Sequence, residues 1–310
     1  MEKLPYNDLN SALRARFGCR VQKITLDAGL TCPNRDGTIS RGGCIYCNPL
    51  GSGTGASRYA TITEQLESAK SFLRQRYGAE KFIAYFQSFS NTYAPVDKLR
   101  SLYEEALAVD DIVGLAIGTR PDCIYDTVLD LIAEMNERVY VWLEYGLQSI
   151  HDRSLDLINR GHTVKTFIDA VSLTRRHGID VVVHVILGLP GENREDMLAT
   201  ARALGEIDIQ GVKIHLLYVI RGTPLHRMYE RGDYRCLTRE EYVGILCDFL
   251  ALLPPHVIIH RLTGDPHHDE LVAPFWALEK DKNLKAIRER LLEHDIRQGK
   301  FFNERIRTGT

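Results

Sequence analysis

The sequence contains no apolar run long enough to cross a bilayer, which takes about 20 consecutive apolar residues. Its first residues, MEKLPYNDLNSALRARFG, lack the apolar stretch of a secretory signal. Internal repeats and low-complexity linkers are missing as well. These absences argue against a membrane-spanning or exported protein, and we expect a cytoplasmic protein that makes no membrane contact.

A disulfide framework and an excess of one charge are also missing. The 310 residues include seven cysteines, an odd number at uneven spacings, which argues against paired disulfides and favours metal ligation. The formal net charge is −2, which argues neither for nor against a nucleic-acid partner. With 44% hydrophobic residues, the chain is long enough for one barrel-sized core and a small appendage.

Three of the seven cysteines, Cys32, Cys44 and Cys47, share one glycine-rich loop, TCPNRDGTISRGGCIYCN. Three thiolates can hold a metal and leave a coordination position open, which is typical of a catalytic site. The alternatives are a structural zinc with a histidine as fourth ligand and a redox pair at Cys44 and Cys47. No histidine lies between Cys19 and Tyr93 and the chain has no second CxxC motif, which counts against zinc.

Apolar strand-like runs alternate with amphipathic helical runs along most of the chain. The pattern predicts strands near residues 21–26, 82–86, 112–117, 139–145, 180–187 and 212–219. It predicts helices near residues 61–76, 95–108, 123–135, 164–177, 194–206 and 239–252. Six such units predict an α/β fold, a partial (β/α)6 TIM-like barrel whose open side admits a large substrate.

The chain divides into three predicted parts. Residues 1–20 form an N-terminal extension, residues 21–253 form the partial barrel, and residues 254–310 form a short C-terminal extension. The last part holds a short strand, the polar loop TGDPHHDE and a charged helix from about residue 284. We expect it to pack on the barrel and to contact the substrate there.

Glycine or polar residues follow each predicted strand, at the end of a barrel where active sites are built. After strands two to six these segments read FQSFSNTY (86–93), GTRPD (118–122), EYGLQS (144–149) with RGH (160–162), LGLPGE (187–192) and LYVIRGTPL (217–225). Any one of them is compatible with an ordinary turn. Their occurrence at the same end of successive strands indicates one shared site.

The cysteine triad, with Tyr46 directly before its last member, and these strand ends resemble the radical S-adenosylmethionine (SAM) superfamily. In that superfamily three thiolates hold a 4Fe-4S cluster, and SAM chelates the fourth iron. Eleven residues separate Cys32 from Cys44, against three in the usual CxxxCxxC spacing. This longer gap and the ExGxQS segment at 144–149 resemble the branch that contains the catalytic subunit of Elongator. The likeness spans residues 24–225 and implies a barrel of the radical SAM type.

The resemblance implies an enzyme that passes one electron from an external flavodoxin- or ferredoxin-like donor, through the cluster, to SAM. SAM would then yield a 5′-deoxyadenosyl radical. By resemblance, Tyr46 lies against the adenine, Gln148 and Arg160 contact the ribose and the carboxylate, and Ile186 packs on the adenine. Further implied cofactor contacts are Gln87 and Ser88, where many members have Gly-Gly-Glu, and Glu144 and Leu217.

Other chemistry-bearing residues permit two readings each. Cys123 follows the GTRPD segment, where its thiol is a candidate catalytic group; the alternative is a small buried side chain. His267 and His268 are candidate metal ligands or substrate contacts, although adjacent side chains seldom converge on one ion. His184 interrupts an apolar strand, where a hydrogen-bonded core histidine is the simpler interpretation.

The Elongator-like resemblance implies the wobble uridine of tRNA as substrate. Basic residues in the tail, interspersed with Phe301 and Phe302, suit phosphate contacts. These are Lys280, Lys282, Lys285, Arg288, Arg290, Arg297, Lys300, Arg305 and Arg307. Acidic neighbours such as Glu279 and Glu289 leave a solvated helix face equally compatible with the pattern. The alternatives are a radical SAM enzyme acting on a small molecule or peptide, and a non-catalytic module with a structural metal.

Overall fold

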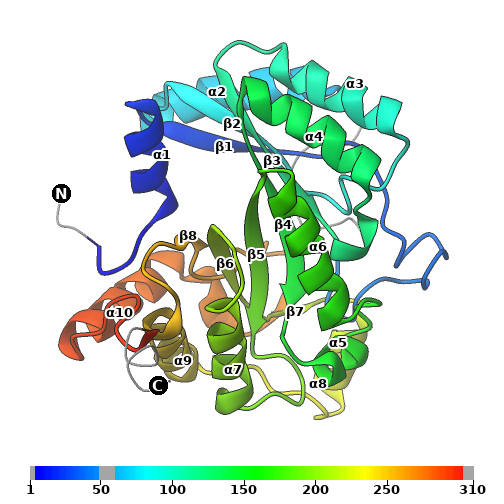
Figure 1. Ribbon diagram of the computed structural model, residues 1–310. Helices are drawn as coiled ribbons and strands as arrows, with labels where there is room; N and C mark the ends of the chain where they lie inside the picture. The colour runs from blue at the N-terminus through cyan, green and yellow to red at the C-terminus, as the bar shows by residue number, and fades with distance from the viewer. Residues whose placement is uncertain (1–3, 49–59, 303–310) are drawn as a thin grey trace, which may run out of the picture.

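The computed structural model describes residues 4–48 and 60–302. Its centre is a sheet of seven parallel strands whose spatial order, β1-β2-β3-β4-β5-β6-β8, follows the chain. The strands are β1 (Val21–Leu26), β2 (Lys81–Phe86), β3 (Ile112–Thr119), β4 (Tyr140–Gln148), β5 (Asp180–Leu187), β6 (Gly211–Leu216) and β8 (Ile258–Arg261). The sheet curls into a half-barrel (Figure 1), so the predicted α/β partial barrel is confirmed.

Helices cover the convex face of the half-barrel (Figure 1). They are α2 (Ile62–Tyr77), α3 (Val96–Leu107), α4 (Asp126–Arg138), α6 (Val164–Arg176), α7 (Arg194–Leu204) and α9 (Arg239–Leu252). Local signals fix their ends: α2 and α9 begin with reciprocal capping boxes, Thr61 with Glu64 and Thr238 with Glu241. Gly78 ends α2 in the left-handed conformation that glycine adopts without steric cost.

The tail contributes more to the sheet than the sequence pattern predicted. Strand β8, from the predicted C-terminal extension, pairs in parallel with β6 and becomes the seventh strand. The sixth strand ends at Leu216, three residues before the predicted end. The chain turns there, and β7 (Val219–Ile220) instead pairs antiparallel with β9 (Leu271–Ala273). Helix α10 (Lys280–Glu293), four residues longer at its start than predicted, packs on α9.

Short elements that the sequence pattern did not reveal complete the fold. Helix α1 (Leu9–Phe17) precedes β1, α5 (Asp152–Leu157) follows β4, and α8 (Pro224–Glu230) follows β7. Single 3₁₀ turns span Pro121–Cys123 and Phe275–Leu278. No helix among the described residues is long and apolar enough to cross a membrane.

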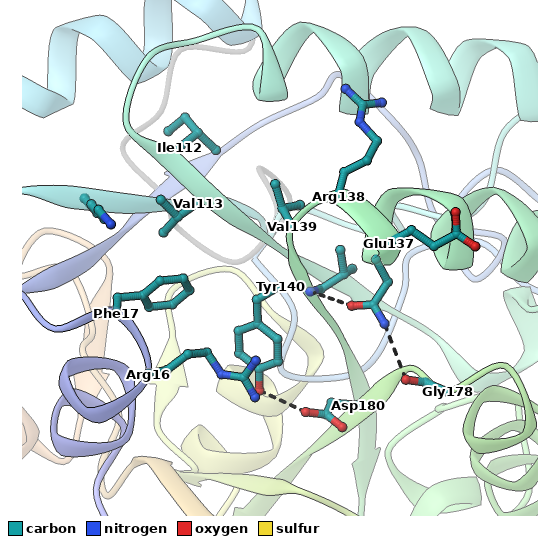
Figure 2. Close-up of a pocket in the computed structure, with 13 residues that line it drawn as sticks. Arg16, Phe17, Ile112, Val113, Glu137, Arg138, Val139, Tyr140, Gly178 and Asp180 are labelled. Atoms are coloured by element: carbon teal, nitrogen blue, oxygen red, sulfur yellow. Dashed lines mark hydrogen bonds between the residues drawn. The ribbon is translucent and has the colours of Figure 1, made fainter.

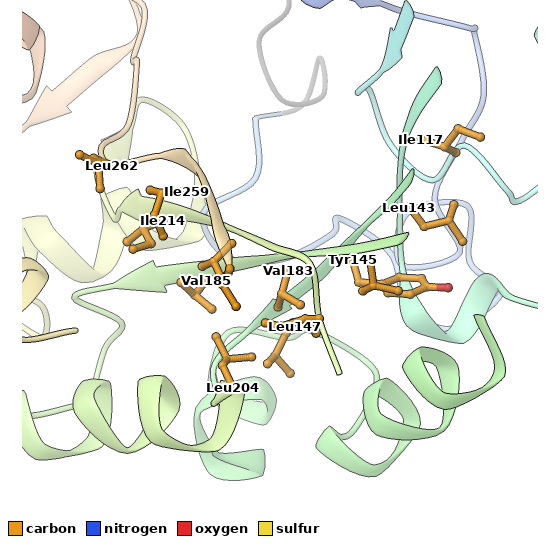
Figure 3. Close-up of a cluster of buried hydrophobic side chains, with 14 of the residues drawn as sticks. Ile117, Leu143, Tyr145, Leu147, Val183, Val185, Leu204, Ile214, Ile259 and Leu262 are labelled. Carbon is orange, nitrogen blue, oxygen red and sulfur yellow. The ribbon is translucent and has the colours of Figure 1, made fainter. Parts of the chain in front are cut away.

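The main hydrophobic core lies between the convex face of the sheet and the helices. Alternate residues of each strand point outward into it, as Leu143, Tyr145 and Leu147 of β4 do, and all three are fully buried. Figure 3 shows these side chains with Val183 and Val185 of β5, directed toward helices that include Leu204 of α7. Alternation of this kind is the geometry of any strand, so the neighbouring residues must face the inside of the barrel.

The inside of the barrel is closed at the end where the strands begin. There Leu13 of α1 packs with Ile83, Ala116 and Val182 in a separate apolar cluster. Beside this apolar cluster lies a cavity of ≈ 680 Å³, where the Arg16 guanidinium lies 3.8 Å from the centre of the Tyr140 ring (Figure 2). Because this cavity is at the starting ends of the strands, it lies away from the cysteine loop, which follows the end of β1.

Candidate active site

The cysteine loop leaves β1 and folds into tight turns around its three thiols. Backbone N–H groups of Arg35 and Cys47 donate to the carbonyls of Cys32 (2.8 Å) and Cys44 (3.0 Å). Cys44 is buried, whereas Cys32 and Cys47 are partly accessible. Gly42 and Gly43 have positive φ angles of 97° and 79°, which most side chains disfavour, so the glycines before Cys44 permit this turn.

The loop is tied to the segment that follows β4. The Asn34 side-chain amide donates to the Asn159 carbonyl (2.6 Å), and the Asn159 amide donates to the Gly43 carbonyl (2.8 Å). The backbone N–H of Ile45 donates to the carbonyl of Ile158 (3.1 Å). Neither asparagine was singled out from the sequence, because residues more than a hundred positions apart carry no local signal.

Two N–H donors approach the sulfur of Cys44, the Asn34 amide and the Arg160 guanidinium, each at 3.7 Å. Donors of this kind stabilise thiolates and tune iron–sulfur clusters. Burial and the neighbouring Cys44 thiol raise the pKa of Cys47. As the side chains stand, no three His, Cys, Asp or Glu residues in the described part of the chain are arranged to hold a metal ion. The thiols would therefore need to converge when a metal binds.

Three of the residues predicted to contact the cofactor lie together. Tyr46, Ile186 and Leu217 belong to one apolar cluster beside the loop, formed where β5 and β6 end. Burial is the main cause that raises the pKa of Tyr46 well above its ordinary value, with the Cys44 thiol adding to it. The cluster offers an apolar wall next to the thiols.

Arg160 and Gln148 are both buried next to this wall. The Arg160 guanidinium donates twice to the Gly146 carbonyl, at 2.6 and 3.0 Å, in addition to its contact with Cys44. Gln148 has a positive φ of 81°, which is strained for a residue with a side chain, and its Oε1 is buried without a partner. A Cβ at Gly146 would lie 2.5 Å from the Arg160 guanidinium, so a larger residue there would displace this side chain.

The GTRPD segment supplies a second buried guanidinium that the sequence interpretation did not assign. Arg120 is bound to both carboxylate oxygens of Asp122 (2.7 and 2.8 Å), while its third nitrogen is buried without a partner. Burial, followed by the charges of Arg160 and Arg120, lowers the pKa of His162 to about 3. Unpartnered atoms on Arg120 and Gln148 indicate polar ligands that the protein itself does not provide.

The predicted catalytic Cys123 is almost completely buried. Burial, with a contribution from Asp122, raises the pKa of its thiol to about 12, so it carries a proton at neutral pH. Its sulfur lies 3.9 Å from the Ser90 hydroxyl. Ser88, on the same loop after β2, is also buried, and the backbone N–H of Gln87 donates to the Leu26 carbonyl (3.3 Å).

Glu144 faces the inside of the barrel, below the loop. Its carboxylate accepts hydrogen bonds from Lys23 (3.2 Å), Trp142 (3.0 Å), His184 (2.7 Å) and Lys213 (3.1 Å). Burial alone would raise the pKa of Glu144, but Lys213, Lys23 and His184 outweigh it and hold that pKa well below its ordinary value. Its carboxylate is thus fully engaged by the protein.

The polar tail is only partly near the loop. Glu270 accepts from the Asn48 amide (2.6 Å), next to Cys47, whereas His267 and His268 are exposed and lie near Asp269. The tail lysines have acidic partners: Lys280 with Asp265, Lys282 with Glu279, Lys285 with Glu289, and Lys300 with Asp295. Arg305 and Arg307 lie outside the described residues.

Comparison with known proteins identifies the family of this chain. The sequence profile of the radical SAM superfamily matches residues 35–204, beginning three residues after Cys32 and including Cys44 and Cys47. The profile of the radical SAM C-terminal domain matches residues 209–293. The chain belongs to the radical SAM superfamily. It is therefore an enzyme of that superfamily, whose members bind a 4Fe-4S cluster and SAM.

Relatives place this radical SAM enzyme near Elongator-like proteins. YtqA of Bacillus subtilis (strain 168) is 45% identical over 96% of this chain and 92% of its own. A tRNA uridine(34) acetyltransferase of Dehalococcoides mccartyi (strain CBDB1) is 33% identical over 52% of this chain and only 36% of its own. The solved structure of the archaeal Methanocaldococcus infernus Elp3 superimposes with a TM-score of 0.68 at 18% identity, covering 90% of this chain and 64% of that one. The radical SAM fold and the likeness to the Elongator branch are confirmed.

Proposed function

We propose that this radical SAM enzyme holds a 4Fe-4S cluster with Cys32, Cys44 and Cys47, cleaves SAM reductively to a 5′-deoxyadenosyl radical, and modifies the wobble uridine of tRNA. One observation carries the cofactor part. Near the three-cysteine loop, where parallel strands end, two buried polar atoms have no partner, one on Arg120 and one on Gln148. We infer a cytoplasmic location and an external one-electron donor of the flavodoxin or ferredoxin type.

The cluster, when bound, supplies the electron that breaks the sulfonium C–S bond of SAM. The chain's own residues do the rest. Asn34 and Arg160 donate N–H groups to the Cys44 sulfur and so orient this proposed cluster ligand. Tyr46, Ile186 and Leu217 form an apolar wall that keeps water away from the adenine side.

Recognition of the polar parts of SAM falls to the buried groups near the wall. A guanidinium with a free N–H suits a carboxylate, because the hydrogen bond is charge-assisted. Arg160 is the predicted partner, and the unpartnered nitrogen of Arg120 is an additional candidate. The free Oε1 of Gln148 is an acceptor that suits a ribose hydroxyl or the SAM ammonium group.

The tRNA part is supported by a relative whose name states tRNA uridine(34) as its substrate, although the likeness covers only half of this chain. The deeply buried Cys123 keeps its proton at neutral pH, which suits a hydrogen-atom donor. The C-terminal basic residues are proposed phosphate contacts. Their pairing with carboxylates means that tRNA would have to displace those partners.

Reconstitution with iron and sulfide under anaerobic conditions tests the cofactor proposal. The wild type should bind about four irons and form 5′-deoxyadenosine from SAM. Cys44→Ala should lose both properties. Cys247→Ala is the matched control, because Cys247 is buried in α9 and bonded to the Ile287 carbonyl. Zinc without iron in the wild type would refute the cofactor proposal.

Arg160→Ala tests the SAM contact separately. Loss of a charge-assisted contact should weaken SAM binding about ten- to a hundredfold. Equilibrium dialysis with labelled SAM measures this. An unchanged dissociation constant would show that another group, with Arg120 as the first candidate, holds the carboxylate.

Mass spectrometry of tRNA nucleosides tests the substrate proposal. A strain that lacks the gene should lose or change a nucleoside at the wobble position, and the wild-type gene should restore it while the Cys44→Ala gene should not. An unchanged nucleoside profile would reject tRNA and favour the small-molecule or peptide alternative.

A further inference from the structure

The concave side of the half-barrel holds a buried polar cluster that the proposed chemistry does not use. We call it the lumen cluster. Its members come from β1, β2, β4, β5, β6 and β8: Lys23, Tyr85, Trp142, Glu144, His184, Lys213, His215 and His260. Glu144 is at its centre, and the Tyr85 hydroxyl joins through a hydrogen bond from Lys213 (2.6 Å).

The lumen cluster holds more basic groups than acidic ones. The amines of Lys23 and Lys213 face one carboxylate, and both also lie over the Tyr85 ring at 4.5 and 4.4 Å. Burial lowers the pKa of Lys213 well below its ordinary value, although Glu144 opposes the shift. The three histidines carry no negative charge, so Glu144 supplies the negative charge of the cluster by itself. Because an uncompensated buried charge is costly, one carboxylate does not compensate two protonated lysines, and an additional anionic partner would stabilise the charged form of Lys213.

Hydrogen bonding in the lumen cluster is also incomplete. Nε2 of His215 and Nδ1 of His260 are buried and have no hydrogen-bond partner. The His260 side chain is only 3% exposed, and its Nδ1 lies 3.9 Å from Glu144, which is too far for a hydrogen bond. The rings of His184 and His215 lie 5.1 Å apart without bonding to each other. Buried polar atoms left unpaired in this way indicate a missing ligand.

The lumen cluster lies one layer below the candidate cofactor site. Gly146, whose carbonyl holds Arg160, comes two residues after Glu144, and Ile186 of the apolar wall comes two residues after His184. Two residues along a strand advance about 7 Å. Lys23 and His184 each keep 18% of their side chains accessible, so the cluster is not sealed.

We propose that the lumen cluster is the substrate's anion subsite, where Lys23 and Lys213 bind a carboxylate or phosphate group and the unpartnered His215 nitrogen completes the contact. The inference rests on the proposed function for its meaning, because that function places the radical one layer above. Glu144 is a positioning residue: its carboxylate holds both ammonium groups in place. A group anchored here would present the adjoining part of the substrate to the cofactor layer.

Trp142 provides a local signal for the test, because its Nε1 donates to Glu144 and the chain has only one other tryptophan, Trp276. In a Trp276→Phe background, the full-length reconstituted protein is titrated with sodium phosphate and with sodium acetate at constant ionic strength. Sodium chloride is the reference. A saturable change in Trp142 emission is expected with at least one of the two oxyanions. Preference for acetate assigns a carboxylate, and preference for phosphate assigns a phosphate group.

Lys213→Met and Lys23→Met should each raise the dissociation constant of the oxyanion about ten- to a hundredfold. Lys23→Met keeps the test valid if Lys213→Met does not fold, because Lys23 is less buried. Lys165→Met is the matched control, since Lys165 is an exposed partner of Asp169 on α6 and should bind oxyanion like the wild type. Emission that follows ionic strength alone, or equal affinities in all variants, would overturn the proposal.

The titration contains neither SAM nor tRNA, so it separates this proposal from the proposed function. Saturable binding in a protein that does not cleave SAM would keep the subsite and remove the radical chemistry. SAM cleavage without saturable oxyanion binding would keep the radical chemistry and reject the anion subsite.

Discussion

The two faces of the same sheet have opposite chemistry. On the convex face, Leu143, Tyr145 and Val183 belong to the hydrophobic core that fills the space between the sheet and the helices. On the concave face, their direct neighbours Glu144 and His184 form a charged network. The same strands thus contribute to the hydrophobic core on the convex face and to the proposed anion subsite on the concave face. The difference shows that burial in this protein does not imply an apolar environment.

Removing the central charge of the concave face should have the largest effect. Glu144→Gln removes the carboxylate that faces the amines of Lys23 and Lys213, and we expect a loss of about 3–5 kcal/mol in the free energy of unfolding. Urea unfolding under reducing conditions measures it. Glu134→Gln, which breaks an exposed pair with Arg100, is the control and should cost less than about 1 kcal/mol. Equal losses in the two variants would contradict the contrast between the faces.

A truncation on the convex face should cost nearly as much by a different mechanism. Leu143→Ala leaves a cavity among fully buried side chains, and we expect a loss of about 2–5 kcal/mol. Oxyanion binding in the lumen should stay at the wild-type affinity, because Leu143 points away from it. A change in affinity together with the loss of stability would show that the two faces are coupled.

Acid should affect the concave face selectively. Burial, with the charge of Lys213, lowers the pKa of His184 to about 4, from an ordinary value of 6.5. The fold therefore favours neutral His184, and its contribution to stability is present above pH 6.5 and is lost as the pH falls toward 4. The groups that face it are Glu144, Lys213, His215, Lys23 and His260.

Between pH 7 and pH 5 the loss from His184 should be about 2 kcal/mol. Urea unfolding at both pH values measures it, and His184→Gln should remove that part of the pH dependence. The convex-face variant Leu143→Ala should keep the full wild-type pH dependence. If His184→Gln leaves the slope unchanged, another buried group, with His162 as the first candidate, is responsible.

The smallest effect is expected outside both faces. Lys165→Met removes an exposed ion pair with Asp169, one helical turn away, which should change the free energy of unfolding by no more than about 0.5 kcal/mol. Thermal unfolding at low and high salt measures it. A larger effect would mean that surface charge, and not only the lumen, contributes to stability.

The convex face could be predicted from the sequence, and the concave face could not. Helical period and apolar strand-like runs predicted the barrel units, and the cysteine loop with its strand ends predicted the family. The lumen cluster joins residues such as Lys23 of β1 and Lys213 of β6, which are far apart in the sequence and in the strand order. Their segments, VQKITL and GVKIHL, share no motif, so no local pattern connects them with each other.

The predicted and observed structures also differ at the edge of the barrel, and long-range pairing is again the cause. Strand β8 is only four residues long, and its place beside β6 is fixed by pairing with residues about fifty positions earlier. Glu144 was predicted to contact the cofactor because of its motif, and the structure shows four donors on its carboxylate that the sequence did not reveal. The roles of the site residues, Glu144 and Cys123 among them, stay predictions.

The hydrogen bonds between the cysteine loop and the segment after β4 also bear on how the protein opens. Asn34 of the loop donates to Asn159 of the segment after β4, and Asn159 donates back to Gly43 of the loop. Neither segment can therefore move away without breaking both hydrogen bonds. We therefore expect the backbone amides of residues 34–45 and 158–160 to exchange with solvent deuterium as one cooperative unit. Cys32 and Cys47 are already partly accessible, so such an opening would mainly expose the buried Cys44. The access of oxygen to the Cys44 thiol would then depend on the hydrogen bonds of these two asparagines.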